Sequence, residues 1–254
     1  MQNPKNILIT GASSGIGEAL AYNYALKKVD NLFICGRNKE RLQDVKKKCE
    51  SLGTKTHAKI IDVSNKEEME AWIAGIDKKT TLDLVFANAG ISRGAKKGNE
   101  TSQQTYDIFD ININGVLNTV FPAIDIFRKN KKGQIAITSS IAGYKGLPTA
   151  PAYSASKACV KAWGEALRCQ LARENIEVSI ICPGFVKSRI TDQNTCTMPF
   201  FMPAEKAASI ISRRLTKNRG LITFPWQMRV AISIISALPN FITDMILSKL
   251  PEKS

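Results

Sequence analysis

The chain has 254 residues, of which 44% are hydrophobic, and a formal net charge of +14. This is long enough for one sizeable buried core, so we expect a single domain over residues 1–254. The polar opening segment 1–6 lacks the apolar core of a signal peptide, which argues against export and favours the cytoplasm. Six cysteines without Cys-x-x-Cys spacing and a single histidine argue against a metal site and a disulfide framework.

The basic residues form short scattered clusters, such as Lys46 to Lys48 and Lys131-Lys132. No DNA- or RNA-binding motif accompanies them, so we expect no nucleic-acid partner. A solvated basic surface is the interpretation we favour. Attraction to anionic cofactors, acidic carrier proteins or lipid headgroups is the alternative.

Short apolar runs alternate along the chain with amphipathic segments of helical length. This alternation predicts an α/β fold, a Rossmann-type doubly wound parallel sheet with helices on both faces. The runs are apolar on successive residues, as expected for strands covered on both sides. Strands are predicted at residues 7–10, 32–35, 59–63, 82–87, 134–138 and 178–182, and helices at 16–28, 39–52, 66–77, 103–127, 152–174 and 204–217.

A glycine-rich turn, Thr10-Gly-Ala-Ser-Ser-Gly-Ile-Gly17, follows the first predicted strand. Glycines there let a strand turn sharply into a helix and bring backbone N–H groups close to a pyrophosphate. The segment 11–15 also matches the nucleophile elbow of hydrolases, but that motif needs a histidine late in the chain, and the single histidine is His57. We therefore predict cofactor contacts at Gly11, Ser13, Ser14, Gly15, Ile16 and Gly17.

The second predicted strand ends in Cys35-Gly-Arg-Asn38, without the carboxylate that commonly binds the ribose hydroxyl of NAD. Arg37 can form paired hydrogen bonds with a 2′-phosphate, which predicts a preference for NADP(H), with NAD(H) as the second choice. A solvated arginine at the start of a helix is the alternative.

Tyr153 and Lys157 are four residues apart in a predicted helix, so they share one face. By itself, such a pair is weak evidence for a catalytic site, because many Tyr/Lys pairs lie on solvated helix surfaces. Together with the glycine-rich turn, it predicts an acid beside a nucleotide site.

In combination, these motifs resemble the short-chain dehydrogenases/reductases, over the chain as far as about Gly220. The resemblance implies an NAD(P)-dependent enzyme that interconverts a carbonyl and a secondary alcohol by hydride transfer. Where the family often has threonine after Pro183-Gly184, this chain has Ser188. The resemblance implies further cofactor contacts at Asp62, Val63, Asn88, Ala89, Gly90, Tyr153, Lys157, Pro183, Gly184, Val186 and Ser188.

The resemblance also implies a catalytic set of Asn112, Ser140, Tyr153 and Lys157. Tyr153 would exchange the proton, and the charge of Lys157 would lower the pKa of the phenol and hold the ribose. Ser140 would hydrogen-bond the substrate oxygen, and Asn112 would hold a water. In the ordinary alternative, the serine finishes a strand and the asparagine caps or kinks its helix.

The segment 185–203 carries Met198, Phe200, Phe201 and Met202, and Trp226 and Met228 are candidate neighbours. We expect it to cover a small-molecule substrate, a lipophilic carbonyl or alcohol. A lid that rests on the core is the alternative. The resemblance further implies a homodimer or homotetramer, with the helices at 103–127 and 152–174 at the interface.

The segment 225–250 is expected to form a C-terminal helical extension. Its nine-residue apolar stretch, 230–238, is too short to span a bilayer, which needs about twenty residues. We expect core or subunit-interface helices, with weak docking on a membrane surface as the alternative. For the whole chain, a non-catalytic NADP(H)-binding sensor or interaction protein is the alternative function, against which the presence of Tyr153 and Lys157 counts.

Overall fold

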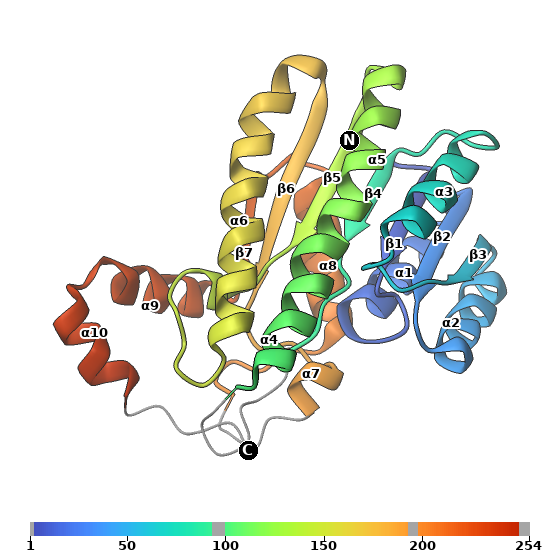
Figure 1. Cartoon of the computed structure of the whole chain (residues 1–254). Helices are drawn as coiled ribbons and strands as arrows, with labels where there is room; N and C mark the ends of the chain where they lie inside the picture. Colours follow the sequence, from blue (N-terminus) through green and yellow to red (C-terminus); the bar gives the residue numbers. More distant parts are fainter. Residues whose placement is uncertain (1–2, 93–99, 193–197, 249–254) are drawn as a thin grey trace.

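The computed structural model describes residues 3–92, 100–192 and 198–248 (Figure 1). Within these residues, seven parallel strands form one sheet in the order β3-β2-β1-β4-β5-β6-β7. The chain builds outward from β1 in one direction and from β4 in the other, so the strand order reverses between these two strands. The strands are β1 (Asn6–Thr10), β2 (Asn31–Gly36), β3 (Lys55–Ile60), β4 (Leu84–Ala87), β5 (Gly133–Thr138), β6 (Ile176–Pro183) and β7 (Leu221–Phe224).

Helices cover both faces of this sheet and form two separate cores. On one face lie α1 (Gly15–Leu26), α2 (Lys39–Ser51) and α8 (Ala204–Leu215); on the other lie α3 (Lys66–Asp77), α5 (Gly115–Asn130) and α6 (Pro151–Leu171). Within β1, Ile7 and Ile9 pack into the first core and Leu8 into the second. Successive residues are therefore apolar because both faces of the strand are buried.

The strands differ from the prediction at the two edges of the sheet. The third strand was predicted at 59–63, but β3 is Lys55–Ile60 and most of its side chains are exposed or half-buried. Its first three residues are polar, as an exposed edge strand allows, so a search for an apolar run placed the strand several residues too late. The other edge strand, β7, lies outside every predicted strand.

Two predicted helices are interrupted in the structure. The helix predicted at 103–127 consists of α4 (Ser102–Phe109), a π-helical turn at Asp110–Asn114, and α5. A π-helical turn inserts one extra residue and is invisible to a helical periodicity search. The helix predicted at 152–174 ends as α6 at Leu171 and is followed by a 3₁₀ turn.

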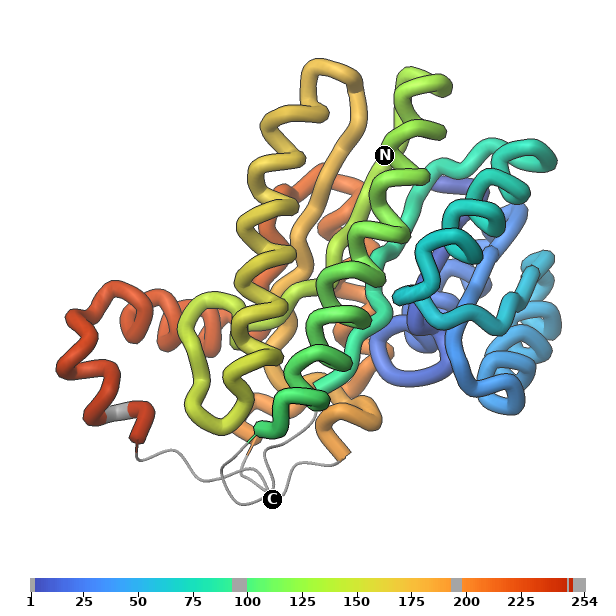
Figure 2. Tube along the Cα trace, in the orientation of Figure 1, coloured from blue at the N-terminus to red at the C-terminus, as the bar shows by residue number. Residues whose placement is uncertain are grey.

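The C-terminal helices stand apart from the two cores. Figure 2 shows α9 (Trp226–Ala237) and α10 (Asn240–Leu247) in red, extending from one side of the body. No residue of α9 is buried, so the expectation that this segment joins the core is wrong for α9. The segment 185–203 contains the short helix α7 (Arg189–Asp192), and its residues 193–197 lie outside the described part of the chain.

Gly133, at the start of β5, provides a test of core packing. A Cβ atom there would overlap the ring of Phe127, which is fully buried. Gly133→Ala should therefore lower the free energy of unfolding by about 1–3 kcal/mol, the usual cost of overpacking. Urea denaturation would measure this change.

The matched control for this variant is Gly75→Ala. Gly75 lies inside α3 with no atom within 4 Å of an added Cβ. The alanine should raise stability by about 0.5–1 kcal/mol through its better helix propensity. Equal effects of the two substitutions would contradict the packing argument.

Candidate active site

The main cavity lies where the carboxyl ends of the strands meet. Its volume is about 590 Å³, and it opens at the reversal of strand order between β1 and β4. This is the place where doubly wound sheets bind their ligands. Most residues predicted from the sequence line it: Gly11, Ser13, Ser14, Gly15, Ile16, Arg37, Asp62, Val63, Asn88, Ala89, Gly90, Ser140, Tyr153, Lys157, Pro183, Gly184, Val186 and Ser188.

Gly17 and Asn112, the other two predicted residues, do not line the cavity but support its wall. A Cβ atom at Gly17 would overlap the carbonyl oxygen of Gly11 and lie 2.6 Å from the side-chain nitrogen of Asn88. Gly11 and Gly15 have φ angles of +66° and +60°, which glycine adopts without strain. The sequence Gly-x-x-x-Gly-x-Gly is thus required by backbone conformation at two positions and by close contact at the third.

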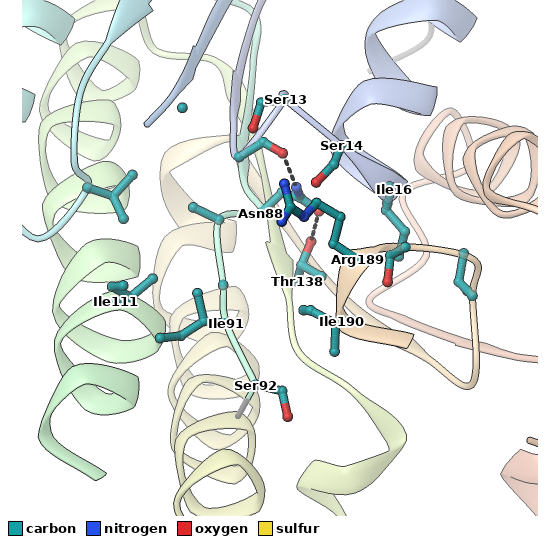
Figure 3. A pocket seen from close by; sticks show the side chains of 18 of the residues that line it. Ser13, Ser14, Ile16, Asn88, Ile91, Ser92, Ile111, Thr138, Arg189 and Ile190 are labelled. Carbon is teal, nitrogen blue, oxygen red and sulfur yellow. Dashed lines mark hydrogen bonds between the residues drawn. The ribbon is translucent and has the colours of Figure 1, made fainter. Parts of the chain in front are cut away.

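Asn88 ties the ends of the central strands together. Its side-chain nitrogen donates to the carbonyl oxygen of Thr10 at 3.1 Å. Its side-chain oxygen accepts from the hydroxyl of Thr138 at 3.2 Å (Figure 3). The hydroxyl of Thr10 in turn accepts from the backbone N–H groups of Asn88 and Ala89. These bonds join the ends of β1, β4 and β5, and so hold one wall of the cavity.

Tyr153 and Lys157 both lie on α6 and both reach the cavity, as their spacing predicts. The ammonium of Lys157 donates to the carbonyl oxygen of Thr138 at 2.9 Å and lies 5.8 Å from the centre of the Tyr153 ring. Ser139 donates to the backbone carbonyl of Lys157 at 2.7 Å, which fixes α6 against the end of β5. The phenol, the ammonium and the Ser140 hydroxyl therefore share one wall.

Burial is the largest influence on the pKa values of Tyr153 and Lys157. It raises the pKa of Tyr153, and the hydrogen bond with Ser140 offsets only part of that increase. The expectation that Lys157 lowers this pKa is therefore not met. Burial also lowers the pKa of Lys157 to about 8, so the charge that was to act on the phenol is itself disfavoured.

Asn112 lies in the π-helical turn and is fully buried. Its side-chain oxygen accepts from the backbone N–H of Ile91 at 2.8 Å. Its side-chain nitrogen donates to the carbonyl oxygen of Ile91 and to the hydroxyl of Ser156. Both amide hydrogens are thus used by protein groups. The side chain positions the loop after β4 and has no N–H left to donate to a water.

Arg37 lies at the end of β2, as predicted, 3.5 Å from the carboxylate of Asp62. Partial burial would raise the pKa of Asp62, but hydrogen bonds from the Ser64 backbone and hydroxyl, together with the charge of Arg37, lower it. The pair is exposed enough for either partner to bind a ligand instead. Because the contact between Arg37 and Asp62 is long, Arg37 is available to bind a ligand at the mouth of the cavity.

Several cavity residues were not predicted. Arg41, one turn beyond Arg37, lines the cavity, and its buried Nε atom has no hydrogen-bond partner in the described part of the chain. Arg189 of α7 also lines it, and Figure 3 shows its side chain extending into the cavity. Arg41 could have been predicted, because it follows Arg37 by four residues in the sequence. Arg189 follows Ser188 directly but belongs to no motif. The other unpredicted lining residues are Gly36, Asn38, Ile61, Ile91, Ser92, Ile111, Thr138, Ser139, Ile190 and Thr191.

Comparisons with known proteins agree with this geometry. The family model for short chain dehydrogenases matches residues 5–198. An uncharacterized oxidoreductase of Myxococcus xanthus is 32% identical over 241 residues, which cover 94% of this chain and 95% of the relative. The 17-beta-hydroxysteroid dehydrogenase 13 of Rattus norvegicus is 28% identical over 244 residues, which cover 93% of this chain and 80% of the relative. A crystal structure of a short-chain type dehydrogenase/reductase from Mycobacterium marinum matches with a TM-score of 0.79 at 23% identity. The match covers 87% of this chain and 93% of that structure.

The doubly wound sheet and the cavity at its strand reversal define a dinucleotide-binding oxidoreductase. The chain belongs to the short-chain dehydrogenase family. It is an NAD(P)-dependent enzyme of the type that acts on CH–OH or C=O groups.

The lowered pKa of Lys157 makes stability depend on pH. Between the folded value of about 8 and the ordinary value of 10.5, the unfolded chain holds a proton that the folded chain has lost. The free energy of unfolding contributed by this residue therefore rises with pH across that window. Compared with Lys157→Met, the wild-type protein should gain stability between about pH 8 and pH 10. Urea denaturation of both proteins at a series of pH values would check this, and a constant difference would contradict it.

Proposed function

We propose that the protein is an NADP(H)-dependent reductase or dehydrogenase that interconverts a lipophilic ketone or aldehyde and its alcohol. The observation that carries this proposal is the grouping of Tyr153, Ser140 and Lys157 on one wall of the cavity that also holds the glycine-rich turn. When bound there, the nicotinamide cofactor supplies or accepts the hydride.

In this proposal, Tyr153 acts as the proton donor to the carbonyl oxygen in reduction and as the acceptor in oxidation. Its raised pKa keeps the phenol protonated, which suits proton donation. Ser140, which already forms a hydrogen bond with the phenol, donates its hydroxyl hydrogen to the same carbonyl oxygen of the substrate. Lys157 binds the ribose and returns a proton to Tyr153, a role that suits an ammonium with a pKa of about 8. Asn112 acts by positioning the loop at Ile91.

The preference for NADP(H) over NAD(H) rests on the adenosine end of the cavity. Arg37 is partly exposed there, and Arg41 has a buried N–H group without a partner among the described residues. Two guanidinium groups that line the same part of the cavity suit a 2′-phosphate, which offers several acceptor oxygens. Asp62 would then exchange its contact with Arg37 for the adenine ring or the solvent.

The lipophilic substrate is supported by the apolar cover near the nicotinamide end. Met202 is buried beside Val186, to which it forms a β-bridge, and Phe200 and Phe201 are exposed. Met228 of α9 packs against Gly184. The rat relative is named for a hydroxysteroid, which is an apolar alcohol.

We further propose that the enzyme works in the cytoplasm as a homodimer or homotetramer. The faces of α5 and α6 that are turned away from the core support this assembly. Phe121 is 52% exposed and its ring lies 5.6 Å from that of Trp163. Along α6, the exposed positions beside them are small residues, including Ala155, Ala162 and Ala166, which permit close helix packing.

Tyr153→Phe tests the proposed reaction. The variant keeps the ring and removes the proton donor, so NADPH consumption with a panel of aliphatic, aromatic and steroid ketones should fall by about 10²–10⁴-fold. NADPH binding, measured by fluorescence, should be nearly unchanged. If neither protein turns over any ketone but both bind NADPH, the alternative of a cofactor-binding sensor is favoured.

Arg37→Ala tests the cofactor preference, with Arg189→Gln as the matched control. Loss of a charge-assisted bond to the 2′-phosphate should weaken NADPH binding by about 10- to 100-fold and leave NADH binding unchanged. Arg189 faces the diphosphate side, near Ser14, so its loss should weaken both cofactors alike. Equal effects of Arg37→Ala on NADPH and NADH would refute the preference.

A further inference from the structure

The C-terminal arm, which comprises α9 and α10, carries an exposed apolar surface that the catalytic reaction does not use. Five large apolar side chains on it are between 50% and 76% exposed. Soluble monomers rarely expose so much apolar surface in one place without a partner. These side chains are Trp226, Val230, Ile234, Phe241 and Met245.

The exposed side chains follow helical spacing. Trp226, Val230 and Ile234 are four residues apart on α9, so they form a single row. Phe241 and Met245 repeat this spacing on α10. Each helix therefore carries a row of exposed apolar side chains and not isolated exposed residues; the two rows together are called the stripe.

Contacts on the opposite side fix the direction of this face. The hydroxyl of Ser236 donates to the carbonyl oxygen of Tyr144 at 3.2 Å, and Lys145 donates to the side-chain oxygen of Asn240 at 3.2 Å. Thr243 and Leu247 of α10 are buried. Because these contacts tie the inner side of the arm to the body, the exposed stripe faces away from it. Figure 1 shows the arm itself extending outward from the body.

The charge beside the stripe is positive. Arg229 lies next to Val230 on α9, and α9 contains no acidic residue. The pKa of Arg214 is lowered, first by burial and then by the charges of Arg213, Arg229 and Arg219. These four arginines are therefore near enough to interact electrostatically. None of them forms an ion pair within the described residues. The one acidic residue of α10 is Asp244.

An apolar stripe with Arg229 beside it, and no acidic residue on α9, matches the boundary between the headgroups and acyl chains of an anionic bilayer. A second copy of the chain matches it less well, because α9 offers no carboxylate to the arginines of its copy. The arm would lie along the surface: α9 is 12 residues long, about 18 Å, and no helix in the described ranges is long and apolar enough to cross a membrane.

We propose that the arm binds the surface of membranes rich in anionic lipid, with the side chains of the stripe in the acyl boundary and Arg229 at the headgroups. The proposal goes beyond the redox reaction and stands without it. If the substrate is lipophilic, as proposed above, the contact of Met228 with Gly184 places the nicotinamide end of the cavity beside the bilayer.

Vesicle co-sedimentation tests this proposal with the full chain and no redox substrate. At low salt, the wild-type protein should sediment with vesicles of phosphatidylcholine and phosphatidylglycerol, and much less with phosphatidylcholine alone. Replacing Val230, Ile234 and Phe241 by serine together should weaken binding at least tenfold, and Arg229→Gln should reduce it and its salt dependence. The control Leu26→Ser removes an equally exposed apolar side chain, 66% exposed on α1, and should bind as the wild type does.

Circular dichroism and NADPH affinity of the serine variant would show that its fold and cavity are intact. Wild-type protein that stays in the supernatant with anionic vesicles at low salt would overturn the proposal. So would a serine variant that loses self-association in sedimentation velocity without any vesicle binding by the wild type, since the stripe would then be an interface between copies. Because ketone turnover is measured separately, an inactive protein that binds vesicles would contradict only the proposed reaction.

Discussion

The whole site depends on how closely the ends of β1, β4 and β5 are held together. Asn88 and Thr10 make this connection through side-chain bonds that replace the sheet ladder where the strands diverge. The glycine-rich turn can then pass over the strand ends because Gly17 leaves room for both the Gly11 carbonyl and the Asn88 amide. A side chain at that position would separate the first helix from the sheet, and the cavity would lose the wall that the glycine-rich turn forms.

The same connection carries the proton chemistry. Thr138, which bonds Asn88, also offers its carbonyl oxygen to Lys157. The buried ammonium therefore donates one fixed hydrogen bond and has little solvation, and burial also raises the pKa of the phenol beside it. Burying two ionisable groups costs folding free energy. The cost is reflected in the two pKa values: that of Lys157 is lowered to about 8 and that of Tyr153 is raised, so each group favours its neutral form.

The sequence predicted those parts of the molecule in which a local pattern and its burial coincide. The central strands were found because both of their faces are buried, and the glycine-rich turn and the Tyr153–Lys157 pair because fixed spacings decide their geometry. The edge strand β3 and the π-helical turn at Asp110–Asn114 were missed, since neither has an apolar period of its own. Arg189 could not have been found from spacing. It reaches the cavity only because the segment after β6 folds back over Gly15, where Ser188 lies against the glycine.

The edge strand β3 has a further consequence for how the molecule associates. Lys55 and Lys59 are both exposed on it, at the free margin of the sheet. Another sheet that approached this margin to continue the backbone ladder would meet these lysine charges, a common protection against edge-to-edge aggregation. The sheet is thus protected from growing into a larger β structure at this margin, and assembly is left to the helical faces.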